Sequence, residues 1–259
     1  MGKLFNRDSL DTPHIDRLAD MGVRFNHAYV QSPICGPSRI CFYTGRYTFS
    51  HGSTLNYAPL PVSELTLGDY LQPLGIRTAV VGKTHVVPNR RELERLQINP
   101  ASSVGQQLQE GGFEPYFRDD GIHPDASPDR YADYNHYLRQ HGFDTHNPWH
   151  QFTHGTTDEQ GEFVSGWFLE NSHRAADIPE EHSETTVTTT QAMAFIDEAS
   201  RAEQSWCLHL SYIKPHWPFM APAPYAQMFG ADEVQPANRA AEDLSQAPQS
   251  ACPWWRTYW

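Results

Sequence analysis

The chain has 259 residues, enough to bury one sizeable hydrophobic core, and we expect a single domain over residues 1–259. Its formal net charge is −12 and no block of Lys or Arg interrupts it, so no nucleic-acid partner is expected. Four scattered cysteines fit neither a disulfide framework nor a zinc site, which favours a reducing, cytoplasmic compartment. No apolar run approaches the ~18 residues that cross a bilayer, so no membrane partner is expected either.

The first predicted elements are a helix and a strand. Thr12 is expected as the N-cap, Pro13 is tolerated in the first turn, and Gly22 ends the helix. Residues 23–30 alternate partly between apolar and polar side chains and are predicted as a strand, with Phe25 and Tyr29 on one face.

The next segment carries a cysteine at a predicted change from extended chain to helix. Pro37 is acceptable in the first helical turn, so Cys35 lies at the helix N-terminus. Backbone N–H groups there favour an anion, and Arg39 one turn later adds positive charge. These features predict an activated thiolate or an oxyanion site at Cys35, with a buried structural cysteine as the alternative.

Two later units share the order helix, strand and polar tip. A helix from Thr66 to Gly75 precedes a strand at 76–81, and a helix at 185–202 precedes a strand at 206–213. The strands are followed by polar residues at 82–85 and 214–218, at the strand ends where α/β sheets bind ligands. The repeated pattern predicts an α/β fold, a three-layer sandwich with a mostly parallel central sheet.

Residues 88–184 are rich in Gly, Pro, His and aromatic residues and show little periodicity. We interpret them as an irregular insertion that contains short helices or strands, either an active-site wall or a peripheral insertion. Their irregularly spaced histidines are expected to be solvated or packed on aromatic rings, rather than to bind a metal: His123, His136, His141, His146, His150 and His154.

The string Cys35-Gly36-Pro37-Ser38-Arg39, followed by Thr44-Gly45-Arg46, resembles the signature of the sulfatase family in the alkaline phosphatase superfamily. Three further segments resemble the family. Residues 12–18 resemble its segment upstream of the cysteine, residues 82–85 its strand tip with lysine and histidine, and residues 214–216 its later histidine loop. Residues 208–225 are most similar to the branch of arylsulfatases and phosphonate monoester hydrolases. The resemblance implies an alkaline phosphatase-like fold and hydrolysis of sulfate esters, with phosphonate monoester or phosphodiester hydrolysis as the alternative.

The resemblance also implies a modified nucleophile. A formylglycine-generating maturation enzyme would convert Cys35 into formylglycine, whose hydrated form attacks sulfur or phosphorus. A divalent cation would bind this group, Ca²⁺ in most sulfatases and often Mn²⁺ in the phosphonate branch. The substrate would be a small sulfate or phosphonate ester.

The roles of the remaining residues follow from the same resemblance. Arg39 would hold the hydrated formylglycine, and Lys83 would bridge it to the ester. His85 and His216 would act as the acid and the base. The Lys83 and His85 pair favours sulfate monoesters, because the phosphonate branch tends to carry Tyr and Thr there. Two further residues are candidates for substrate contact, each with a structural alternative as a turn residue or a strand cap: Asn56 and Lys214.

The metal site departs from the family pattern. Family members begin with a strand that ends in a metal-binding Asp, and they carry a later Asp-His-Gly or Asp-Asn motif. Asp8 and Asp11 follow no predicted strand, and Asp232 and Asp243 lack the later context. We therefore expect a chain truncated at both ends, with only Cys35 among the metal ligands and with weak activity. The alternative of another class is a non-catalytic remnant that binds anions or a partner protein, and the oligomeric state stays open.

Overall fold

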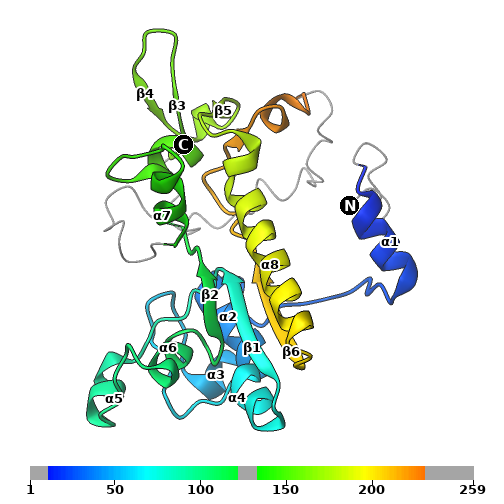
Figure 1. Ribbon diagram of the computed structural model, residues 1–259, viewed down its shortest axis with the longest axis vertical. Helices are drawn as coiled ribbons and strands as arrows, with labels where there is room; N and C mark the ends of the chain where they lie inside the picture. Colours follow the sequence, from blue (N-terminus) through cyan, green and yellow to red (C-terminus); the bar gives the residue numbers. More distant parts are fainter. Residues whose placement is uncertain (1–10, 122–132, 231–259) are drawn as a thin grey trace, which may run out of the picture.

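The computed structural model describes residues 11–121 and 133–230 (Figure 1). Its α-helices are α1 (Pro13–Met21), α2 (Cys35–Thr44), α3 (Thr48–His51), α4 (Leu67–Leu71), α5 (Arg90–Arg95), α6 (Ser103–Gln109), α7 (Asp133–Gln140) and α8 (Glu184–Arg201). Its strands are β1 (Arg77–Gly82), β2 (Glu114–Arg118), β3 (Gly155–Thr157), β4 (Phe163–Ser165), β5 (Ala175–Ala176), β6 (Trp206–Ser211) and β7 (Ala221–Pro222). Within these described ranges, no helix combines the length and the apolar character that crossing a membrane requires.

The central sheet contains three parallel strands in the order β2-β1-β6. Gly82, the last residue of β1, pairs with Ser211 of β6 on one side and with Arg118 of β2 on the other. All three strands therefore end at the same edge of the sheet. Ligand sites of open α/β sheets lie at this edge.

The two faces of β1 are buried against different helices. Ala79 packs with Phe195 and Ala199 of α8, whereas Val80 packs with Ile40 and Tyr43 of α2. Successive side chains of a strand point to opposite faces, so α8 and α2 cover opposite sides of the sheet. This arrangement confirms the predicted three-layer α/β fold with a parallel central sheet.

The predictions for the first thirty residues are confirmed for the helix and wrong for the strand. α1 begins at Pro13 as expected, although the Thr12 side chain makes no capping hydrogen bond. Residues 23–30 form no strand, and Phe25 and Tyr29 are 78% and 84% exposed. Partial alternation produces a strand only where a neighbouring strand and a covering layer are available, and within the described ranges this segment has neither.

The second predicted helix is divided. α4 ends at Leu71, and a 3-10 turn over Gln72–Leu74 continues to Gly75, which has a φ of 73°. Pro73 explains the change, because proline cannot donate the backbone hydrogen bond that would extend an α-helix.

The range 88–184 is more than a peripheral insertion, because it supplies β2 to the central sheet. Its residues Tyr134, Leu138 and Trp149 also pack in one core with Val81 of β1 and Val187 of α8. The hidden elements expected in this range are therefore part of the main fold. Its remaining short turns lie at Trp149–Thr153, Leu169–Asn171 and Glu180–His182, and another lies at Tyr225–Gln227.

Candidate active site

Cys35 is the first residue of α2, at the carboxyl edge of the sheet. Its Sγ donates to Asn56 Oδ1 at 3.3 Å, and the Gly36 backbone N–H donates to the same oxygen at 2.9 Å. A Cβ on residue 36 would lie 3.0 Å from the Cα of Asn56, which explains the glycine at this position. Asn56 also lies in a turn in which the Ala58 N–H donates to Leu55 O. Its position is therefore consistent with both predicted roles, a contact to the substrate and a turn residue.

Two cationic side chains from neighbouring elements lie beside this cysteine. The Arg39 guanidinium donates to Lys83 O and to Ser211 Oγ, each at 2.9 Å, and so joins the ends of β1 and β6 to α2. Lys83 is only 5% exposed, and burial lowers the pKa of its ammonium. The pair forms a positive local field in a chain of net negative charge.

The side chain of His85 also lies beside Cys35. A hydrogen bond from the His85 side chain, opposed by burial and helped by the charge of Lys83, lowers the pKa of the Cys35 thiol to about 7. The backbone of His85 is held at a φ of 55°, which is uncommon for a residue other than glycine. Strain of this kind persists where surrounding contacts enforce it.

Those contacts come from residues that the sequence analysis did not single out. Asp120 Oδ1 accepts the backbone N–H of Thr84 at 2.9 Å and that of His85 at 3.3 Å. Arg118 donates to Asp120 Oδ2 at 2.8 Å and to Thr84 Oγ1 at 2.9 Å. Glu110 Oε2 accepts from Thr84 Oγ1 at 2.6 Å and lies 2.9 Å from Arg118 Nε. This network fixes the tip that carries Lys83 and His85.

His216 approaches the same cluster from the loop after β6. Burial, followed by the charge of Lys83, lowers the pKa of His216, so the imidazole is neutral at pH 7. Its Nδ1 is hydrogen-bonded to Trp217 O and must be the donor, because a carbonyl oxygen only accepts. Nε2 is then the unprotonated nitrogen, and it is available to accept a proton.

Lys214 is placed differently from the predicted substrate contact. Its Nζ donates to Pro218 O at 2.9 Å and Met220 O at 3.0 Å, and it lies 3.3 Å from His154 Nδ1. These three partners account for the three donors of an ammonium group. The geometry therefore supports the alternative, in which Lys214 holds the loop that follows its strand.

The described residues do not fit a divalent cation. Within 11–121 and 133–230, no group of three His, Cys, Asp or Glu side chains could hold a metal ion. At the tip, Asp120 already accepts from Thr84, His85 and Arg118, and Glu110 accepts from Thr84 and pairs with Arg118. Asp11 is exposed, and Asp8, Asp232 and Asp243 lie outside the described residues.

Two histidines of the range 88–184 pack on aromatic rings, as expected. His141 stacks on Tyr137 with ring centroids 4.0 Å apart, and His154 is fully buried 4.2 Å from Trp149. His123 lies outside the described residues.

A cavity of about 530 Å³ lies on the β6 side of Cys35. Its wall includes His209, whose Nε2 is 3.1 Å from the hydroxyl of Tyr43. Burial, together with the charges of Arg39 and Arg118, lowers the pKa of His209 to about 4. The imidazole therefore stays neutral in the folded chain well below neutral pH.

We expect this histidine to make folding sensitive to acid. The unfolded chain binds a proton at His209 near pH 6.5, whereas the folded chain binds it only near pH 4, so stability falls as the pH drops through this window. Between pH 7 and pH 5 the loss is about 1–2 kcal/mol. Urea unfolding at both pH values should show a loss about 1–2 kcal/mol smaller in His209→Gln than in the parent chain, because His154, whose burial also lowers its pKa to about 4, remains in the variant. Parallel pH dependence in the two proteins would contradict the assignment.

Comparisons with known proteins agree with this geometry. The Sulfatase family model matches residues 2–247. The multifunctional alkaline phosphatase superfamily protein PehA of Trinickia caryophylli is 29% identical over 247 residues, which cover 93% of this chain and 43% of PehA. The N-acetylglucosamine-6-O-sulfatase of Bacteroides thetaiotaomicron is 32% identical over 114 residues, which cover 44% of this chain and 20% of that enzyme.

Among solved structures, a phosphonate monoester hydrolase from Silicibacter pomeroyi superposes with a TM-score of 0.71 at 24% identity, covering 90% of this chain and 42% of the other. At this identity the likeness shows the fold alone. The chain spans less than half the length of PehA and of the hydrolase. Because the family model covers nearly the whole sequence, the chain belongs to the Sulfatase family.

Proposed function

We propose that this chain forms the nucleophile-bearing part of a sulfate-ester hydrolase, and that a maturation enzyme converts Cys35 into formylglycine. The observation that carries the proposal is the meeting of Cys35, Lys83 and His85 at the carboxyl edge of the sheet. Arg39 and Asn56 contact the same region from α2 and the following turn. An anionic ester would enter a site whose nearest charges are positive.

When it is present, formylglycine supplies a hydroxyl nucleophile in place of the thiol. The buried Lys83 ammonium is already desolvated, so its charge acts strongly on the negative oxygens of an ester. His216, neutral and with Nε2 unprotonated, could accept the proton that the hydroxyl of residue 35 loses as it attacks the ester. His85 lies within hydrogen-bonding reach of residue 35. It would act as the acid and donate a proton to the departing alcohol oxygen.

The divalent cation implied by the family, Ca²⁺ or Mn²⁺, finds no matching carboxylates among the described residues. We therefore route no step of the proposal through a metal ion.

The second candidate is hydrolysis of phosphonate monoesters. It is favoured by the likeness to PehA, a multifunctional protein by name, and by residues 208–225, which are most similar to the branch that contains phosphonate monoester hydrolases. Sulfate remains our first choice, because the strand tip carries Lys83 and His85 rather than the Tyr and Thr of that branch.

The matured chain should hydrolyse 4-nitrophenyl sulfate with a kcat/KM about tenfold or more above that for 4-nitrophenyl phenylphosphonate. The matched variant Lys83→Tyr/His85→Thr should reverse the preference if the tip sets it. A phosphonate preference in the parent chain would select the second candidate. No hydrolysis of either ester by matured protein would instead favour a non-catalytic anion-binding or partner-binding chain.

A further inference from the structure

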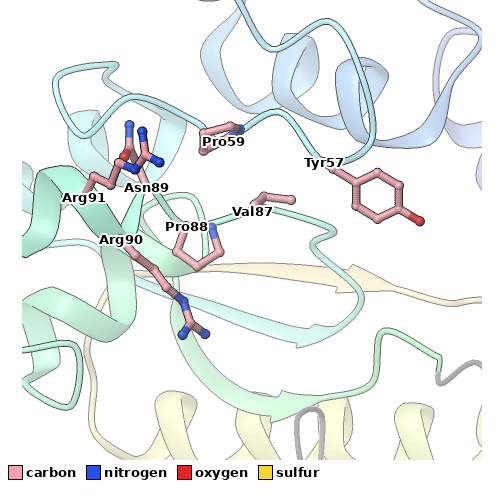
Figure 2. A pocket seen from close by; sticks show the side chains of 7 residues that line it. All are labelled: Tyr57, Pro59, Val87, Pro88, Asn89, Arg90 and Arg91. Atoms are coloured by element: carbon pink, nitrogen blue, oxygen red, sulfur yellow. The ribbon is translucent and has the colours of Figure 1, made fainter. Parts of the chain in front are cut away.

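A groove lies beside two segments of chain that both begin at the active site. One segment follows Asn56, whose side chain contacts Cys35, and the other follows His85. The segments run side by side, since Leu60 N donates to Val87 O at 3.1 Å and Leu60 forms a parallel bridge with Pro88. The hollow beside them has a volume of about 310 Å³ and is lined by Tyr57, Pro59, Val87, Pro88, Asn89, Arg90 and Arg91 (Figure 2).

The groove has an apolar surface near the active site and a cationic end farther away. Tyr57 follows Asn56 directly and is 88% exposed, and Val87, Pro88 and Pro59 continue the apolar surface. Figure 2 shows Tyr57 at one end and Arg91 at the other, with Arg90 extending along the opposite side of Pro88. Exposed aromatic and proline surfaces suit a flat or sugar-like ligand.

The two arginines of this groove lack a counter-ion. Arg90 and Arg91 are exposed, and within the described part of the chain neither forms a salt bridge. The adjacent Glu92 forms no salt bridge with either arginine, and its Oε2 accepts the backbone N–H of Val62 at 2.6 Å. The two guanidinium groups, which lie on opposite sides of Pro88 in Figure 2, add positive charge to this end of the groove in a chain of net charge −12, and this charge favours an anion.

The separation between the two ends limits the ligand's length. Asn56 contacts Cys35, whereas Arg91 lines the opposite end of the groove, beyond Val87 and Pro88, so a ligand that reaches both must extend past the apolar surface. We propose that the groove binds the alcohol portion of the ester and selects sulfate esters whose alcohol carries an anionic group at the end farther from the ester. The identity of the ester rests on the proposed function, whereas binding in the groove does not.

The test uses the full chain and two probes that contain no ester, 4′-hydroxybiphenyl-4-carboxylate and its methyl ester. Equilibrium titration should show the carboxylate bound about tenfold more tightly than the methyl ester. Arg90→Gln/Arg91→Gln should abolish this preference. Arg17→Gln/Arg95→Gln removes the same charge from exposed positions of α1 and α5 outside the groove, and it should keep the preference.

Equal binding of the two probes by the parent chain would overturn the groove assignment, as would a preference that survives in Arg90→Gln/Arg91→Gln. Since the probes cannot be hydrolysed, this result is independent of the proposed reaction. A carboxylate preference in a chain that hydrolyses no sulfate ester leaves the groove in place and removes the proposed function. Sulfate hydrolysis without the preference removes the groove alone.

Discussion

Replacing Cys35 with alanine is expected to lower kcat for aryl sulfate hydrolysis by about 10⁴-fold or more, because a covalent nucleophile is lost. The fold should persist, since Cys35 is half-buried at the first position of α2 and its loss opens no enclosed cavity. Steady-state hydrolysis by parent and variant, each produced with the maturation enzyme, measures the effect. Cys207→Ala, which removes another half-buried free thiol in β6, should keep full activity.

The same assay separates the two nucleophiles that local physics allows at residue 35. With a pKa of about 7, roughly half of an unmodified Cys35 is thiolate at neutral pH, so a thiolate nucleophile is chemically reasonable. Parent protein made without the maturation enzyme should nevertheless be as inactive as Cys35→Ala. Activity in that unmatured protein, abolished by iodoacetamide, would show that the thiolate itself reacts.

Replacing Gly82 with alanine is expected to lower the free energy of unfolding by about 3 kcal/mol or more. Gly82 ends β1 at a φ of 98°, and a Cβ there would lie 2.0 Å from the backbone oxygen of Ser211 in β6. That oxygen also accepts the Lys83 N–H at 3.0 Å, so relieving the clash would shift Lys83 as well. Urea unfolding measures the loss, and the variant should lose catalytic activity in proportion to the displacement of the tip.

Gly45→Ala is the matched control for Gly82→Ala. Gly45 ends α2 at a φ of 66°, and nothing lies within 4 Å of the position of its added Cβ. Its cost should therefore be only that of backbone conformation, about 1 kcal/mol. Similar losses in the two variants would show that the contact between the ends of β1 and β6 is not rigid.

Strands β1 and β6 could be predicted because the local sequence pattern alone indicates them. β1 carries the apolar residues Ala79, Val80 and Val81 and is buried from Thr78 onward, and β6 follows the long helix α8, so both strands were predicted. β6 ends at Ser211, two residues before the predicted end. Lys83 and His85 follow the end of β1, and this position made them candidate site residues, because the position along a strand determines the place at the sheet edge.

The strand β2 could not be predicted in the same way. It contains Pro115 and charged residues at both ends, and it is buried only at Phe117 and Arg118. Without that strand, Asp120 had no predicted place at the edge of the sheet, although it holds the backbone of His85. The error at residues 23–30 has the opposite cause, since a suitable local pattern found no covering partner.

The direction in which long polar side chains point could not be predicted from the sequence either. Lys83 comes directly after β1 and Lys214 three residues after β6, yet only Lys214 donates to the carbonyls of its own loop, those of Pro218 and Met220. Sequence position shows which loop a side chain belongs to, whereas the unpaired carbonyl oxygens around it decide where it points.

The most direct test of the central claim is the mass of the tryptic peptide 25–39 from chain produced together with a formylglycine-generating enzyme. We expect a species that has lost one sulfur and two hydrogens and gained one oxygen relative to the cysteine form. The peptide from Cys35→Ala should show no such change under the same conditions. A peptide that retains the unmodified Cys35 thiol, from a host whose enzyme matures another sulfatase, would contradict the account.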